Sequence, residues 1–175
     1  MRLVSNVFVW GCSKLQRITQ NGVAMEIRRI RATDWDWIQQ WFQDEDLNRE
    51  LGPLDQEWLE HVLNQSDGVQ LVAEQNGQPI GLIGCAWGDG RNLPHAITDI
   101  AVAPPLRGNG QAGAMLEAVL AWPGHPPCRK WVAFVFPENQ RACRFFTRLG
   151  WEHVDFADGM NEFEYKCVCS EPDRS

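Results

Sequence analysis

The chain has 175 residues, of which 44% are hydrophobic, and a formal net charge of −7. This length suits one domain with a single core. No apolar run approaches the roughly 18 residues of a membrane span, and the acidic balance makes nucleic acid a poor partner. We therefore expect no membrane and no nucleic acid among its partners.

Residues 1–24 differ from the remainder, because Arg2, Lys14 and Arg17 are their only charges. The apolar start resembles an export signal, but Asn6 interrupts it and no small-x-small cleavage site follows. We expect an N-terminal extension over 1–24, either disordered or packed as an extra strand. A single domain over 25–168 and a C-terminal tail over 169–175 follow.

Helical signals come after the first expected strand, residues 25–31. Thr33 and Asp36 resemble a capping box, and Trp35 begins an apolar repeat at helical spacing. Trp37 and Trp41 share a second face, which is either core packing or an aromatic substrate wall. Asp55 is the expected N-cap of a second helix that reaches about Gln65.

Strand patterns dominate the rest of the chain. Asn76-Gly77 and Asp158-Gly159 are hairpin turns, and Gly88-Asp89-Gly90 is a loop. A helix from Gly108 ends at Trp122 before Pro123, and another starts at Asn139. The expected strands span residues 69–75, 79–87, 95–103, 130–136, 151–156 and 162–168.

A glycine-rich turn joins the apolar strand near residue 100 to a helix. Gly108, Gly110 and Gly113 let the backbone approach a ligand, and the first N–H groups of the helix lack internal partners, which favours phosphate. No Lys-Ser or Lys-Thr follows, which excludes a P-loop. The bare G-x-G-x-x-G lies past the middle of the chain and is weak evidence for a dinucleotide fold.

Two motifs carry a resemblance to a known family. The run 107–112, RGNGQA, resembles the acyl-CoA signature (Gln or Arg)-x-x-Gly-x-(Gly or Ala) of GCN5-related N-acetyltransferases (GNAT). The family's second pattern is a strand, Asn-x-x-Ala, an aromatic pair and Gly-aromatic. It is matched within 131–151 by Asn139, Ala142, Phe145, Phe146, Gly150 and Trp151.

This resemblance implies an α/β (α+β) GNAT fold. Its mixed, mostly antiparallel central sheet has six to seven strands flanked by about four helices, in the order β-α-α-β-β-β-α-β-α-β-β. The implied cosubstrate is acetyl-CoA, with no metal. The implied oligomeric state is a monomer or homodimer.

The resemblance also assigns cofactor contacts. The pantetheine arm and the thioester are expected on the backbone of Ile100, Ala101, Val102 and Ala103, with Asn139 touching the arm. Phe146 joins this set but occupies a position where many relatives carry the tyrosine that protonates the CoA thiolate. The pyrophosphate is expected on the amides of Arg107, Gly108, Asn109, Gly110, Gln111, Ala112 and Gly113.

Catalysis of amine acylation needs a general base. Asp99 is the first candidate, because it is an acidic residue in an apolar strand, placed as in aminoglycoside 6'-N-acetyltransferases; a structural pairing is the alternative. His95 and Asp89 come next. For the general acid, Tyr165 is the only tyrosine, and Cys143 is a weaker candidate.

The acceptor is expected to be a small, cationic primary amine. The family places its first two helices over the acceptor side, where an acidic window here is either a solvated face or an attraction for such an amine. Trp37, Trp41 and Asp89 are the substrate-binding candidates. The window contains Asp34, Asp36, Asp44, Glu45, Asp46, Glu50, Asp55, Glu57 and Glu60.

Two other functions are consistent with the sequence. One is a protein N-terminal or side-chain N-acetyltransferase of the same fold, and another is a non-catalytic acyl-CoA-binding or sensor module.

The six cysteines lack C-x-x-C spacing, which favours unpaired thiols in a reducing cytoplasm over disulfides or a metal site. Within Cys167-x-Cys169, two unpaired thiols are favoured over a strained bridge.

Overall fold

The computed structural model describes residues 18–20, 23–89 and 92–167. Eight strands form one sheet in the order β1-β2-β3-β4-β5-β6-β8-β7. Among the strand pairs of the described residues, only β5–β6 is parallel. The strands are β1 (Ile18–Gln20), β2 (Val23–Arg29), β3 (Gly68–Gln75), β4 (Gln78–Ala86), β5 (His95–Val102), β6 (Lys130–Val135), β7 (Glu152–Ala157) and β8 (Met160–Lys166).

Five α-helices and two short 3-10 turns connect these strands in the described part of the chain. None of the helices there is long and apolar enough to cross a membrane. The helices are η1 (Ala32–Asp34), α1 (Trp35–Trp41), α2 (Glu45–Leu51), α3 (Gln56–Asn64), η2 (Pro104–Leu106), α4 (Gln111–Leu120) and α5 (Gln140–Arg148).

The predicted fold is confirmed, with two additions. Strand β1 pairs with β2 through Ile18 and Met25, and so adds an edge strand from within the predicted extension; residues 1–17 and the tail 169–175 lie outside the described residues. Helix α2 is a third helix where two were expected. It forms because the Asp44 carboxylate caps the Leu47 N–H at 2.9 Å and Leu47 is buried.

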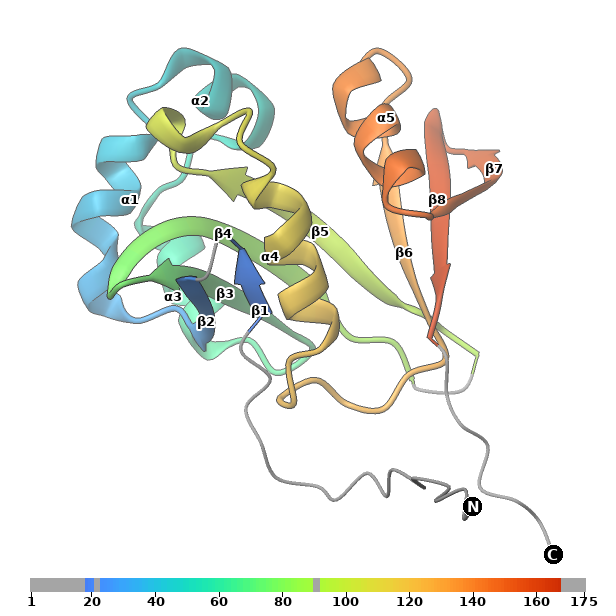
Figure 1. Ribbon diagram of the computed structural model, residues 1–175, viewed down its shortest axis with the longest axis horizontal. Coiled ribbons are helices and arrows are strands. Elements are labelled where there is room, and N and C mark those ends of the chain that lie inside the picture. Colours follow the sequence, from blue (N-terminus) through green and yellow to red (C-terminus); the bar gives the residue numbers. More distant parts are fainter. Residues whose placement is uncertain (1–17, 21–22, 90–91, 168–175) are drawn as a thin grey trace, which may run out of the picture.

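The helices cover the two faces of the sheet separately. Helices α1–α3 lie on one face, where Ile38 and Leu59 pack with Val72 and Leu82 in one buried cluster. Helix α4 lies on the other face, where Met115 belongs to a second cluster that also includes residues of α5. In Figure 1, α4 lies in front of the strands, while α1 and α2 lie at the left, on the opposite side of the picture from α5 and β7.

A β-bulge in β5 changes which face its side chains occupy. Cys85 of β4 is in register with Ile97, but the preceding Gly84 is in register with Asp99, so Thr98 is an extra residue. Ile97 therefore belongs to the α4-side cluster, whereas Ala101 belongs to the α1–α3 cluster. A regular strand would have placed both on the same face.

The parallel β5–β6 ladder is short. It pairs residues 95–97 with residues 131–133. Beyond these pairs β6 continues against β8, and Figure 1 shows β6, β8 and α5 leaning away from the rest of the sheet. We call this divergence of β5 from β6 the splay.

Candidate active site

The glycine-rich turn forms the N-terminus of α4 as the sequence predicted, with a later start than Gly108. Gly110 is the N-cap of α4 with φ +76°, and Gly108 has φ +83°. Both values lie in the left-handed region that glycine adopts without strain. Gly113 donates its N–H to the Gly110 carbonyl at 3.2 Å, so the amides left for a phosphate are those that precede it.

Arg107 fixes this turn through its side chain. Its guanidinium lies 2.9 Å from the Asp44 carboxylate at the N-cap of α2. The Leu47 N–H and then Arg107 lower the pKa of Asp44. The Arg107 side chain thus joins the turn to α2. Its backbone N–H, predicted to contact the pyrophosphate, donates to the Pro104 carbonyl at 3.5 Å.

The backbone of β5 offers hydrogen-bonding groups to the splay. Ala103 donates its N–H to the Ile80 carbonyl on β4 at 2.9 Å. Successive N–H groups of a strand point to opposite sides, so the amides of Ile100 and Val102 point away from β4. Of the four residues predicted to hold the pantetheine arm and thioester, these two are oriented for it.

Asp99 lies beside these amides on the α3 side of the sheet. It is half-buried, and its carboxylate accepts hydrogen bonds from Gln70 Nε2 and Thr98 Oγ1, each at 3.0 Å. Burial raises the pKa of Asp99, and these hydrogen bonds with that of the Gly84 N–H oppose the rise only in part. A carboxyl with a raised pKa at a pocket wall is suited to accept a proton.

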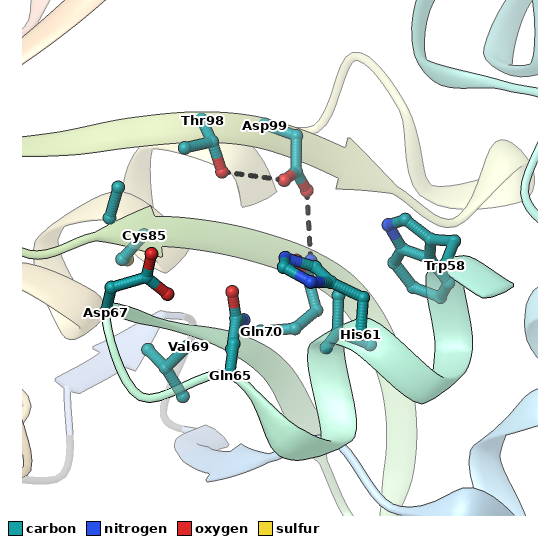
Figure 2. Close-up of a pocket in the computed structure, with 11 residues that line it drawn as sticks. Trp58, His61, Gln65, Asp67, Val69, Gln70, Cys85, Thr98 and Asp99 are labelled. Carbon is teal, nitrogen blue, oxygen red and sulfur yellow. Dashed lines mark hydrogen bonds between the residues drawn. The ribbon is translucent and has the colours of Figure 1, made fainter.

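A pocket of about 300 Å³ opens in front of Asp99. Figure 2 shows the Asp99 carboxylate facing Trp58 and His61 of α3, with Gln70 below it and Asp67 across the pocket. Sequence reasoning did not select Trp58 or His61 as site residues. Their spacing of three residues, which places both on one helix face, was the available signal.

Three predicted residues lie elsewhere. The Trp37 and Trp41 rings pack with centroids 4.5 Å apart, and Trp37 Nε1 donates to buried Asp34 at 3.1 Å. Neither tryptophan lines the pocket. The exposed Asp89 accepts the N–H groups of Asn92 and Leu93 at 2.7 and 2.8 Å, and so holds its own loop.

His95 is fully buried at the start of β5, on the side of the bulge away from Asp99. Its Nδ1 accepts the Gly88 N–H at 2.9 Å, and its Nε2 lies 2.9 Å from the Pro126 carbonyl. Burial lowers the pKa of His95, the Pro126 carbonyl opposes this, and His125 adds to it. With both nitrogens engaged and no place in the pocket wall, His95 is poorly placed to act as the base.

Comparison with known proteins gives the family. Residues 28–151 match the model of the acetyltransferase (GNAT) family. The chain belongs to this family. It is therefore an N-acetyltransferase by class, and acetyl-CoA is its expected acetyl donor.

Solved structures show the same fold for this GNAT member. An acetyltransferase from Thermus thermophilus is 15% identical with a TM-score of 0.70, and the match covers 82% of this chain and 97% of that one. The GNAT domain of S. lividans PAT is 22% identical with a TM-score of 0.67, covering 84% and 93%. SpeG spermidine N-acetyltransferase from Vibrio cholerae is 16% identical with a TM-score of 0.63, covering 81% and 93%.

The second GNAT motif is built around α5. Asn139 caps this helix by accepting the Ala142 N–H at 3.0 Å, and its Nδ2 lies 3.4 Å from Glu50 across the splay. Phe146 is buried, with its ring centroid 5.7 Å from that of Phe163. The motif thus supplies a cap and a packing ring, and Phe146 has no proton to donate.

The two candidate acids have different surroundings. Tyr165 is opposite Trp131 in the β6–β8 ladder, near the base of the splay, and its ring lies 5.6 Å from Trp151. Cys143, on α5, has its Sγ 4.0 Å from the Phe136 carbonyl and 3.5 Å from Asn161 Nδ2. Neither lines the Asp99 pocket.

The acidic window is partly neutralised by arginines that lie outside it in sequence. Arg28 binds buried Asp34 at 2.7 Å, and Arg107 binds Asp44. Burial pushes the pKa of Asp34 upward, but hydrogen bonds from Arg28, the Arg31 N–H and Trp37 lower it overall. Carboxylates of the window are therefore paired with Arg28 and Arg107 as well as lying near Arg49, the one arginine within it. None of the window's carboxylates lines the pocket.

Proposed function

We propose that this protein transfers an acetyl group from acetyl-CoA to the primary amine of a small cationic molecule, with Asp99 as general base. One observation carries the proposal. The β5 bulge directs the Asp99 carboxylate into a pocket while the adjacent Ile100 amide points into the splay. The base and the group that would polarise the thioester are therefore neighbours in the chain.

The chemistry follows from this arrangement. Asp99 accepts a proton from the bound ammonium, directly or through one water, so that a neutral amine attacks the thioester carbonyl. The Ile100 and Val102 amides stabilise the oxyanion of the tetrahedral intermediate. The new C–N bond forms, its nitrogen releases the extra proton to solvent, and the C–S bond breaks. The CoA thiolate takes a proton from solvent because Phe146 replaces the usual tyrosine.

The pocket chemistry supports a cationic acceptor. Its two carboxylates, Asp67 and Asp99, and the face of Trp58 all favour an ammonium group. Its volume of about 300 Å³ is at the lower end for small-molecule sites. A polyamine-like or aminosugar compound fits these limits.

An acceptor panel tests the proposal. Thiol release from acetyl-CoA is measured with diamines, polyamines, aminosugars, an acidic amino acid and a peptide with a free N-terminus. We expect the highest kcat/KM for a cationic small amine. Acetylation of the peptide alone would favour a protein acetyltransferase, and CoA binding without turnover of any amine would favour a sensor module; either result contradicts the proposal.

A further inference from the structure

A cluster of histidine and cysteine side chains lies at the base of the splay. The ligand atoms of His95, His125 and Cys128 all lie within 4.8 Å of one another. Cys167 joins them, with its Sγ 3.6 Å from that of Cys128. His95 and Cys128 are buried, and the other two are half-buried. These four residues, which we call the base cluster, come from the start of β5, the α4–β6 loop and the residue after β8.

The sulfur separation fits a shared metal ion. Tetrahedral Zn²⁺ binds sulfur at about 2.3 Å and imidazole nitrogen at about 2.0 Å, which places two sulfur ligands about 3.8 Å apart and a nitrogen and a sulfur about 3.5 Å apart. The Cys128–Cys167 distance of 3.6 Å agrees with the first value. The ligand atoms of His95, His125 and Cys128 lie up to 4.8 Å apart, so closure of these three around an ion needs movements of about 1 Å.

The surroundings of His125 favour a cation on its ring. Its Nε2 lies 3.1 Å from the Leu120 carbonyl, and its Nδ1 lies 2.8 Å from the Pro126 carbonyl. A neutral imidazole has one N–H, so it can donate to only one of these oxygens. If Nε2–H donates to the Leu120 carbonyl, the lone pair of Nδ1 faces the Pro126 carbonyl oxygen, and the two electron pairs repel each other. A metal ion bound to Nδ1 would remove this repulsion. A ligand histidine whose other nitrogen donates to a backbone carbonyl is common at metal sites.

Local structure holds the ligands near one another before an ion binds. His125 and Cys128 are separated by Pro126 and Pro127, whose fixed φ angles limit the freedom of the loop. Cys167 donates its N–H to the Arg129 carbonyl at 2.9 Å, which keeps it beside the end of this loop. Folding therefore already brings the ligands together, which lowers the conformational entropy that metal binding has to remove.

We propose that the base cluster binds one Zn²⁺ ion through His95, His125, Cys128 and Cys167. Two thiolates and two imidazoles are a ligand set that zinc favours. The ion would clamp the three chain segments where β5 and β6 still pair, and so fix the point from which the splay opens. The sequence did not predict this site, because its ligands lie in three segments and lack C-x-x-C spacing.

His95 must change its hydrogen bonds on binding. In the structure its Nδ1 accepts the Gly88 N–H and its Nε2 contacts the Pro126 carbonyl. Coordination through Nε2 moves the ring proton to Nδ1, so the Gly88 N–H has to turn away. We therefore expect His95→Asn to weaken metal binding less than loss of either cysteine.

Cobalt substitution tests the site without any activity assay. The full chain is reduced, stripped of metal with a chelator and titrated with Co²⁺. We expect a single equivalent to produce the visible bands of tetrahedral Co²⁺ and a thiolate-to-cobalt charge-transfer band, both removed by a single equivalent of Zn²⁺. Zn²⁺ at about 100 times its Kd should raise the Tm by about 5–10 °C.

Matched variants assign the ligands. Cys128→Ser and Cys167→Ser should each weaken Co²⁺ binding at least tenfold and lower the charge-transfer intensity to about half, because one thiolate ligand remains. His125→Asn keeps both thiolates and should weaken Co²⁺ binding at least tenfold, whereas Cys143→Ser, which changes a thiol on α5, should match the wild type. Circular dichroism of the metal-free variants shows whether each one folds, and His125→Asn serves if the buried Cys128 position does not tolerate serine. Absence of the bands in the reduced wild type overturns the proposal, as do an unchanged Co²⁺ affinity and unchanged charge-transfer intensity in both cysteine variants. A Cys128–Cys167 disulfide, with no Co²⁺ binding after reduction, also overturns it.

Discussion

Replacement of Asp99 by asparagine separates a catalytic role from a structural one. Asparagine keeps the shape of the side chain. In the wild type Gln70 Nε2 donates to the carboxylate at 3.0 Å, and the amide oxygen of asparagine can accept the same hydrogen bond. What it loses is the ability to take a proton. Loss of a general base lowers turnover by about 10² to 10⁴, which corresponds to about 2.7 to 5.4 kcal/mol of transition-state stabilisation.

Stability should change in the opposite direction. Burial raises the pKa of Asp99 in the folded protein above its unfolded value. The favourable contribution of the protonated form is therefore complete below the unfolded pKa and is lost as pH rises through the folded pKa. Asparagine stays neutral, so Asp99→Asn should be at least as stable as the wild type at neutral pH. A variant that is inactive yet not destabilised identifies a functional carboxylate.

The assay is steady-state thiol release across pH, together with thermal unfolding. For the wild type, kcat/KM should fall as pH decreases through the raised pKa of Asp99, because the base must be ionised. Asp67→Asn is the matched control, since it removes an exposed carboxylate from the same pocket. It should raise KM for cationic amines and leave kcat nearly unchanged. Unchanged kcat in Asp99→Asn, or a loss of folding, would refute the assignment of the base.

Three further predictions concern the cofactor turn, a buried ion pair and the acceptor. Gly110→Val should abolish the rise in Tm that CoA produces, because valine is strained at φ +76° and crowds the amides. Gly77→Val is the control, because it changes a glycine at φ +71° in a hairpin turn. It should lower stability yet keep the rise in Tm with CoA. Arg28→Ala should lower the free energy of unfolding in urea by about 3 kcal/mol, because it leaves the buried Asp34 charge unpaired. The exposed Arg29→Ala, which removes only a cation–π contact with Trp122, should cost less than about 1 kcal/mol. The KM for a cationic amine should rise with salt, since exposed charges are screened beyond about 8 Å at physiological ionic strength, while CoA affinity should change less; equal responses would contradict an electrostatic role of the pocket.

Local sequence signals were sufficient for most of the fold. Turn residues such as Asn76-Gly77 and the break at Pro123 mark boundaries by backbone geometry, which each residue carries on its own. Helix α2 was missed because it buries Leu47 as its only fully buried residue, so the acidic stretch shows little apolar periodicity. The expected Thr33–Asp36 capping box also differs from the structure, where the Asp34 carboxylate accepts the Arg31 N–H at 2.8 Å.

The site was less predictable, because its residues meet only through tertiary structure. The glycine turn could be located because its positive φ angles demand glycine. The partners of Asp99 could not, since Gln70 is separated from it by 29 positions and Trp58 reaches the pocket from a helix. Trp37 offers the same aromatic chemistry as Trp58, and only packing decides which of them faces the pocket.

The bulge at Thr98 links these observations. In a regular strand Asp99 would lie on the same face as Ile97, against the α4-side cluster, where a carboxylate would meet apolar side chains and the cofactor side of the sheet. The extra residue turns Asp99 to the α3 side and, by the same shift, brings Ile100 to the α4 side with its cluster. One inserted position thus separates the proposed base from the cofactor face, and it does so beside the amides that point into the splay. The sequence of β5 contains no mark of this insertion, because both faces of the sheet are covered by apolar clusters and isoleucine suits either one.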